Sequence, residues 1–234
     1  MKHILLPVGV SLVLTIGAQA LTVSVAYDAG TVNETTALTG FATSGDMMAG
    51  MAVTAYFSDG GSQSLPWATT GAGSGGVSGT DWSLSETGNT FTSDWTLLNS
   101  RSTLLTRLVI DAGPGDTVFD TTAVGDIEGT SGSARGHSFS VSSITAIDSG
   151  DTITATYHDA VALTGDAAVG DLFRSLDVKF EDGLSTGSEL SFVADTDNLK
   201  FAGDIKPVSD STTTLVSLAS ALGGLAILAR RRSV

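Results

Sequence analysis

Apolar and polar positions alternate with a period of two in many short runs between residues 21 and 205. The alternation is clearest in Leu21–Tyr27, Met51–Phe57 and Thr152–Tyr157. Runs of this kind, rich in β-branched and aromatic residues, predict β-strands with one buried face. The same pattern predicts further strands at Gln63–Ala68, Leu104–Ile110, Thr117–Phe119, Ser140–Ile147, Leu172–Phe180 and Glu189–Val193.

Clusters of glycine, aspartate, serine and proline separate these runs. They include Asp59–Gly61, Asp111–Asp116, Ser149–Asp151 and Asp182–Gly183. About ten short strands with turn signals between them predict an all-β fold, in which two antiparallel sheets pack as a β-sandwich. A jelly-roll-like topology is one such arrangement, and a barrel is the alternative.

Two glycine-rich stretches interrupt the pattern, at Thr69–Thr80 and Ile127–Gly136. A phosphate-binding loop would end in Lys followed by Ser or Thr, and a dinucleotide-binding loop would connect a strand to a helix. Asp81 and Trp82 follow the first stretch, and strand-like sequence continues from there. We therefore expect both stretches to be surface loops without nucleotide-binding function.

The N-terminal segment has the features of a secretory signal peptide. Lys2 and His3 precede an apolar stretch, Ile4–Ile16, and the small residues Ala18 and Ala20 flank Gln19. A signal peptidase accepts small side chains at these two positions, so cleavage is expected after Ala20. This assigns residues 1–20 to the signal helix and residues 21–205 to the β-sandwich domain.

The C-terminal segment, residues 206–234, has three parts in series. A polar stretch, Ser209–Thr214, precedes an apolar run, Leu215–Ala229, and the basic cluster Arg230–Arg232 follows. A helix over Thr212–Ala229 would be about 27 Å long at ~1.5 Å per residue. That length just crosses a hydrocarbon core of about 30 Å. Arginines resist translocation, so this transmembrane helix would keep Arg230, Arg231 and Arg232 in the cytoplasm.

This three-part ending resembles the PEP-CTERM sorting signal of exported bacterial proteins. The motif itself corresponds to Val208, Ser209, Asp210, Ser211 and Thr212. Asp210 takes the acidic position of the motif, whereas Ser209 stands where the family usually has proline. The resemblance implies that an exosortase recognises and cleaves the segment, and that the protein belongs to the cell envelope, cell surface or extracellular polysaccharide matrix.

Composition narrows the classes of partner. The chain carries 25 acidic and 11 basic residues, with a formal net charge of −14. Nucleic acid binding requires a basic surface, so we exclude nucleic acid as a partner. The chain has no cysteine, so an exported domain of this size must be stabilised by its core rather than by disulfides.

Calcium is the metal that the acidic positions favour. Asp195, Asp197 and Asn198 offer alternating oxygen ligands, as the start of an EF-hand loop does, but the later glycine and glutamate of that loop are missing. Asp126 and Glu128 form a second, weaker pair. The competing interpretation is a turn at Asp197–Asn198, after the last main strand.

Three tryptophans, Trp67, Trp82 and Trp95, are candidates for stacking on sugar rings. Trp82 would share a strand face with Leu84, and Trp95 with Leu97, so core packing is the competing interpretation.

No catalytic residues are predicted. Two histidines, His137 and His158, remain after signal cleavage, and no serine lies in a nucleophile-elbow motif. We therefore expect a non-enzymatic exported protein, processed by signal peptidase and exosortase. The alternatives are a carbohydrate- or calcium-binding adhesion module and a secreted hydrolase.

Overall fold

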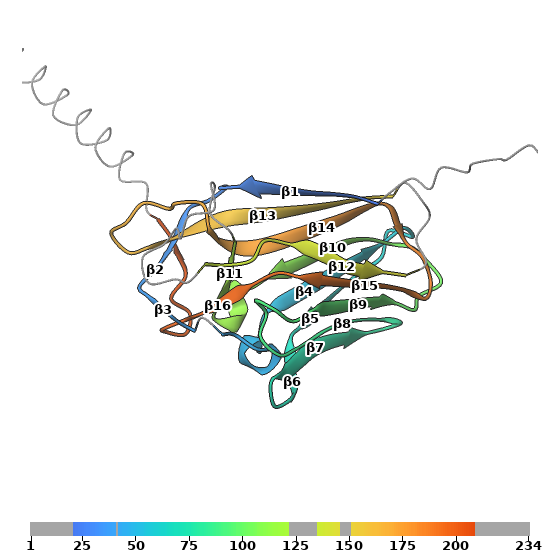
Figure 1. Cartoon of the computed structure of the whole chain (residues 1–234), viewed down its shortest axis with the longest axis horizontal. Helices are drawn as coiled ribbons and strands as arrows, with labels where there is room; N and C mark the ends of the chain where they lie inside the picture. Colours follow the sequence, from blue (N-terminus) through green and yellow to red (C-terminus); the bar gives the residue numbers. More distant parts are fainter. Residues whose placement is uncertain (1–20, 41, 122–134, 146–150, 209–234) are drawn as a thin grey trace, which may run out of the picture.

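The computed structural model describes residues 21–40, 42–121, 135–145 and 151–208. This part of the chain is all-β, and its strands form two sheets that face each other (Figure 1). The two short 3-10 turns, η1 (Gly45–Met48) and η2 (Gly113–Gly115), are its helical elements. The predicted all-β class with two packed, mainly antiparallel sheets is confirmed.

The large sheet has eleven strands. Its main path runs in the order β17 (Lys206–Pro207), β2 (Asn33–Thr35), β13 (Thr152–Leu163), β14 (Leu172–Leu184), β10 (Leu105–Asp111), β4 (Ala52–Phe57) and β5 (Ser62–Pro66). Four strands lie off this path: β1 (Thr22–Asp28), β3 (Leu38–Gly40), β11 (Thr117–Asp120) and β16 (Thr196–Leu199). β1 and β2 run parallel to β13, and the other pairs are antiparallel.

The small sheet is an antiparallel arrangement of six strands. Its order is β12 (Ser140–Ile144), β15 (Ser188–Val193), β9 (Trp95–Asn99), β8 (Trp82–Thr87), β7 (Ser74–Gly79) and β6 (Ala68–Gly71). Trp67 lies between β5 of the large sheet and β6 of the small one. The chain thus passes directly from one sheet to the other at this residue, which closes one side of the sandwich.

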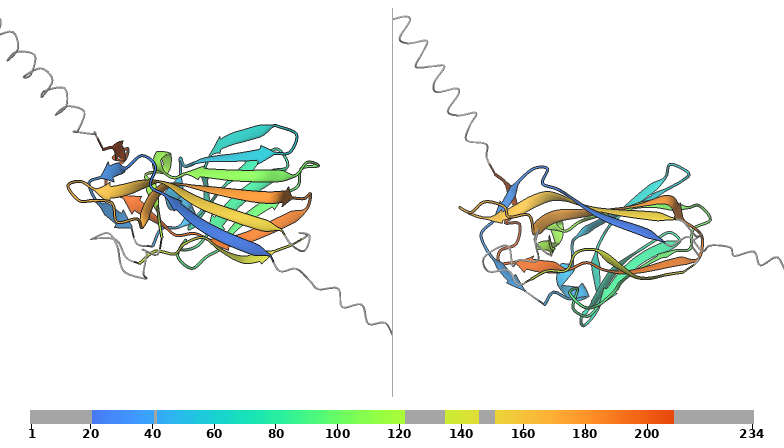
Figure 2. Two further views of the ribbon diagram at one scale, coloured as in Figure 1. Left: turned by 90° about the horizontal axis from the view of Figure 1, so that it is seen from above. Right: turned by 45° about the horizontal axis from the view of Figure 1, so that its top comes forward.

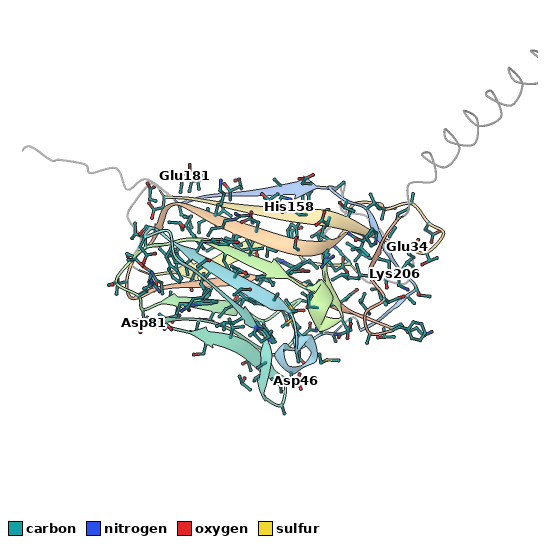
Figure 3. The ribbon with its side chains drawn as sticks, turned by 180° about the vertical axis from the view of Figure 1, so that it is seen from behind. Glu34, Asp46, Asp81, His158, Glu181 and Lys206 are labelled. Atoms are coloured by element: carbon teal, nitrogen blue, oxygen red, sulfur yellow. The ribbon has the colours of Figure 1, made fainter. Side chains whose placement is uncertain are left out.

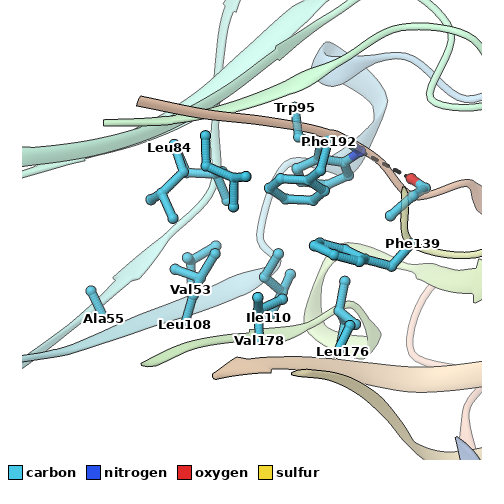
Figure 4. Close-up of a cluster of buried hydrophobic side chains, with 14 of the residues drawn as sticks. Val53, Ala55, Leu84, Trp95, Leu108, Ile110, Phe139, Leu176, Val178 and Phe192 are labelled. Atoms are coloured by element: carbon cyan, nitrogen blue, oxygen red, sulfur yellow. Dashed lines mark hydrogen bonds between the residues drawn. The ribbon is translucent and has the colours of Figure 1, made fainter. Parts of the chain in front are cut away.

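The main hydrophobic core fills the space between the sheets (Figure 4). Leu84, Trp95 and Phe192 project from the small sheet. They face apolar side chains of the large sheet, which include Val53, Ala55, Leu108, Ile110, Leu176 and Val178. Burial of every second residue in strands such as β4 and β9 agrees with the period-two pattern of the sequence.

Two local predictions and one competing interpretation were wrong. The glycine-rich stretch Thr69–Thr80 is not a loop, since most of it forms β6 and β7. Asp182–Gly183 does not end its strand, because β14 continues to Leu184. Asp197–Asn198 is not a turn, since both residues belong to β16.

The predicted terminal segments lie largely outside the described residues. This applies to the signal-cleavage residues Ala18 and Ala20, to the motif residues Ser209–Thr212 and to Arg230–Arg232. Val208, the first motif residue, is described; it is exposed, and its N–H donates to the Val32 carbonyl at 2.9 Å. Within the described ranges, no helix is long and apolar enough to cross a membrane.

Candidate metal centre

Three buried aspartates meet at the end of the sandwich where β11 and β16 pair (Figure 1). Asp120, Asp195 and Asp197 are 1%, 5% and 1% exposed. Each contributes a carboxylate oxygen to a group in which all three oxygens lie within 4.8 Å of one another. We call these three residues the aspartate cluster.

The strand register explains why these side chains converge. β11 and β16 are antiparallel, with Val118 opposite Asp197 and Phe119 opposite Thr196. One step further along, the Asp120 N–H donates to the Asp195 carbonyl at 3.0 Å, so Asp120 and Asp195 are also neighbours across the ladder. Residues directly opposite each other share a face of a sheet, as do residues two apart on one strand.

The segment before β12 lies against the cluster. The His137 N–H donates to the Asp120 carbonyl at 3.1 Å, and the Asp195 N–H donates to the His137 carbonyl at 3.0 Å. A Cβ on Gly136 would overlap the Asp120 carbonyl and carboxylate. Glycine at position 136 therefore lets the backbone approach closer to Asp120 than a larger residue would.

Burial changes the acidity of Asp195. Loss of hydration raises the pKa of its carboxyl group to about 6, although hydrogen bonds from Thr90 and Thr196 act in the opposite direction. The Thr90 hydroxyl donates to Asp195 Oδ1 at 2.8 Å, and the Thr196 N–H donates to the same oxygen at 2.9 Å.

The cluster has the chemistry of a hard-cation site. Calcium binds carboxylate and carbonyl oxygens at about 2.3–2.6 Å, so oxygens on opposite sides of one ion lie about 5 Å apart. The spacing of the three carboxylates fits this range. Full coordination of calcium needs ~6–8 oxygens, and backbone carbonyls or water would have to supply the rest.

The predicted ligand set is partly reproduced. Asp195 and Asp197 do lie together, but the Asn198 side chain is used elsewhere. Its Oδ1 accepts from the Thr43 hydroxyl at 2.9 Å, and its Nδ2 donates to the Met47 carbonyl at 3.1 Å. Asn198 is one residue from Asp197 on a strand and so faces the other way. The pair Asp126 and Glu128 lies outside the described residues.

The tryptophans are core residues. Trp67, Trp82 and Trp95 are 2%, 3% and 0% exposed. Their indole N–H groups donate to Gly45 O, Gln63 Oε1 and Ala194 O, at 2.7, 2.6 and 2.9 Å (Figure 4 shows the third of these bonds). With the ring faces covered by protein, sugar stacking on these residues has no accessible platform.

His158 lies on the solvent-facing side of the large sheet, where Figure 3 labels it. Its Nδ1 is 3.3 Å from Asp28 Oδ2, and its Nε2 is 3.9 Å from Asp177 Oδ2. Ser175 is opposite His158 in the strand register, but the two ring nitrogens face carboxylates. The Nδ1 of His137 lies 2.8 Å from the Ser138 carbonyl. Neither arrangement resembles an activated serine.

A further buried acid, Glu86, lies on β8 with its side chain inside the sandwich and 1% exposed. Neither carboxyl oxygen has a hydrogen-bond partner of good geometry among the residues that the structure describes. Burial raises the pKa of Glu86 to about 8, and the nearby Asp46 carboxylate adds to this, whereas the Gly45 backbone lowers it. At neutral pH the protonated form of Glu86 therefore predominates.

Comparison with protein-family models, with curated proteins and with solved structures finds no match to this chain.

Proposed function

We propose that this protein is an exported, non-enzymatic protein of the cell envelope or extracellular matrix. Its signal peptide delivers it across the membrane, and an exosortase recognises residues 206–234 and cleaves near Val208–Thr214. The observation that carries the proposal is the order of polar motif, short apolar run and arginine cluster at the C-terminus. The folded domain would adopt a jelly-roll-like topology and associate with extracellular polysaccharide.

Two features of the domain support this proposal. It contains no cysteine, so it cannot form disulfides outside the cell. An exported domain without disulfides must be stabilised by its hydrophobic core. The continuous core between the two sheets meets that requirement. The full chain carries a formal net charge of −14, and such an excess of acidic residues favours solubility outside the cell and disfavours binding to anionic lipid.

A truncation after Val208 tests the sorting role and keeps every residue of the described domain. In the producing cell, the full chain should fractionate with the envelope or matrix. The truncated chain should be exported and released into the medium, because it lacks the anchor and the processing site. Equal distribution of the two forms would exclude a sorting role for residues 209–234.

Calcium binding by the domain is the second candidate function, favoured by the aspartate cluster. A calcium ion would join β11 to β16, both of which lie off the main path of the large sheet. Such an ion would stabilise this end of the sandwich, since binding to the folded state alone raises its stability. The role would be structural, in an adhesion or matrix module.

Thermal melting with and without millimolar calcium tests this candidate. Calcium should raise the melting temperature of the wild type, and Asp197→Asn should abolish the rise. Asp166→Asn changes an exposed aspartate in a turn and should retain it. The rise should diminish as the pH falls below about 6, because the protonated Asp195 carboxyl cannot bind the ion. No rise at any pH above 6 would remove calcium from consideration.

A further inference from the structure

The edge of the large sheet formed by β1 is open. β1 pairs with β13 along its full length, and no other described strand pairs with it. Figure 2 shows β1 in blue beside β13, at the opposite edge from the cyan strands β4 and β5. Six of its seven residues are exposed, with Val25 intermediate.

The direction of the backbone groups follows from one hydrogen bond. The Thr22 N–H donates to the Asp151 carbonyl at 3.0 Å, while Thr22 is in register with Thr152. In a parallel ladder, the residues of one parity direct both N–H and C=O toward the neighbouring strand, and the residues between them direct both away. Val23, Val25 and Tyr27 therefore present their backbone groups at the open edge.

β1 has few of the features that prevent edge strands of natural sheets from pairing with another chain. Charged residues, especially lysine, and proline commonly block a free edge. β1 reads Thr-Val-Ser-Val-Ala-Tyr-Asp, and Asp28 at its end is its one charged residue. The opposite edge strand, β5, ends in Pro66. Val23 and Tyr27 are 38% and 43% exposed, so β1 presents apolar side chains as well as free backbone groups.

We propose that the β1 edge pairs with the same edge of a second copy, antiparallel, about a two-fold axis at Val25. In this register Val25 lies opposite Val25 of the second copy, and Val23 lies opposite Tyr27. All three outward-facing residues then exchange backbone hydrogen bonds, about six in total. Axes at Ser24 or Ala26 would allow about four, so the hydrogen-bonding pattern selects Val25.

The side chains are self-complementary in the same register. Val23 of each copy meets Tyr27 of the other, a β-branched and aromatic pair of the kind that stabilises antiparallel strands. Asp28 meets Thr22, so no like charges lie directly opposite each other. This internal match favours a second copy over an unrelated strand as the occupant.

The pairing would also extend the aromatic layer at this edge. Tyr27 stacks on buried Tyr157, with ring centroids 5.7 Å apart, and Val25 packs against the main core. The second copy would add its own Val23, Val25 and Tyr27 to the same face.

Joining two strands of seven residues buries little surface, so we expect a weak dimer that dissociates on dilution. The net charge of −14 on each chain should make it tighter at higher salt.

Sedimentation of the full chain in a mild detergent, over a range of concentrations, tests the proposal. Val25→Pro removes an N–H that points away from β13, so it should leave the fold intact. It removes about two of the six bonds and should raise the dimer dissociation constant by about tenfold or more. Val25→Ala removes the side chain and keeps the N–H, and should have a smaller effect. A wild type that stays monomeric at every concentration overturns the proposal and leaves the edge to a foreign strand.

Disulfide cross-linking tests the register independently of whether Val25→Pro folds. The chain has no cysteine, so single substitutions report on one contact each. Ser24 and Ala26 face each other across the proposed axis as a non-hydrogen-bonded pair, at about 4.5 Å between Cα atoms. A mixture of Ser24→Cys and Ala26→Cys chains should cross-link as the mixed dimer faster than either chain with itself. Faster self-linking of either variant would place the axis elsewhere and contradict the Val25 register.

Discussion

At the scale of single residues, the interior of this domain contains carboxyl groups that are hard to accommodate. Glu86 and Asp195 are both buried, and burial raises the pKa of each. The Asp195 carboxylate accepts hydrogen bonds from the Thr90 hydroxyl and the Thr196 N–H. Glu86 has no partner of good geometry in the described structure, so its ionised form costs more free energy to bury than its neutral form.

The pH dependence of Glu86 is therefore predictable in sign. Its pKa is higher in the folded chain, so its contribution to stability is fully present below pH 4.5 and is lost as the pH rises through about 8. Glu86→Gln stays neutral and should be more stable than the wild type at pH 9, by on the order of 4–5 kcal/mol for a pKa raised from 4.5 to about 8. At pH 5 the two should unfold at similar denaturant concentrations.

Glu181→Gln is the matched control, because Glu181 is exposed (Figure 3). Because its side chain is in solvent, Glu181→Gln should be about as stable as the wild type at pH 9. A Glu86→Gln chain whose stability falls between pH 5 and pH 9 as steeply as that of the wild type would show that Glu86 is not the group responsible.

The aspartate cluster shows what a sequence can and cannot predict at this scale. Asp195 and Asp197 are two residues apart, so their common strand face was predictable from period-two geometry. Asp120 is far from both in the chain, and the β11–β16 register that brings it into the cluster has no local signature. The likeness to the start of an EF-hand loop predicts Asn198 as a ligand, but its parity on β16 directs it to the opposite face.

At the scale of elements, β7 shows why a glycine-rich stretch can be a strand. A Cβ at Gly75 would overlap the Gly45 carbonyl and the Trp67 indole, and one at Gly76 would lie 2.6 Å from the Leu84 carbonyl. These glycines allow η1 and β8 to pack directly against the β7 backbone. The sequence suggested a loop because glycine is rare in strands, and close approach by another element is the exception to that tendency.

Gly75→Ala should therefore destabilise the domain, although it adds only one methyl group. Overpacking against backbone atoms costs about 2 kcal/mol or more, which corresponds to a melting temperature lower by about 5 °C. Among the described residues, a Cβ at Gly71, at the end of β6, has its nearest contact at 3.9 Å, with Ser74 Cβ, so Gly71→Ala should leave the melting temperature nearly unchanged. Equal melting temperatures for the two variants would mean that the close packing around Gly75 is not required.

At the scale of the whole molecule, the sandwich is closed where Trp67 joins β5 to β6 and open at β1. Strand positions and the buried face of most strands were predictable, because alternation is a local property. The parallel pairing of β1 and β2 with β13 was not, since pairing partners depend on how distant segments meet. The predicted signal peptide, residues 1–20, and the predicted sorting segment, residues 206–234, flank this domain in the sequence.

We propose that both ends of the chain are processed during export, and intact mass spectrometry of the protein recovered from outside the cell tests this processing at both termini in one experiment. We predict a chain that begins at Leu21 and ends between Val208 and Thr214, with or without a group that the exosortase attaches to the new C-terminus. A chain recovered with Arg230–Arg232 still attached would contradict C-terminal processing, because the C-terminal segment would then be a permanent membrane anchor.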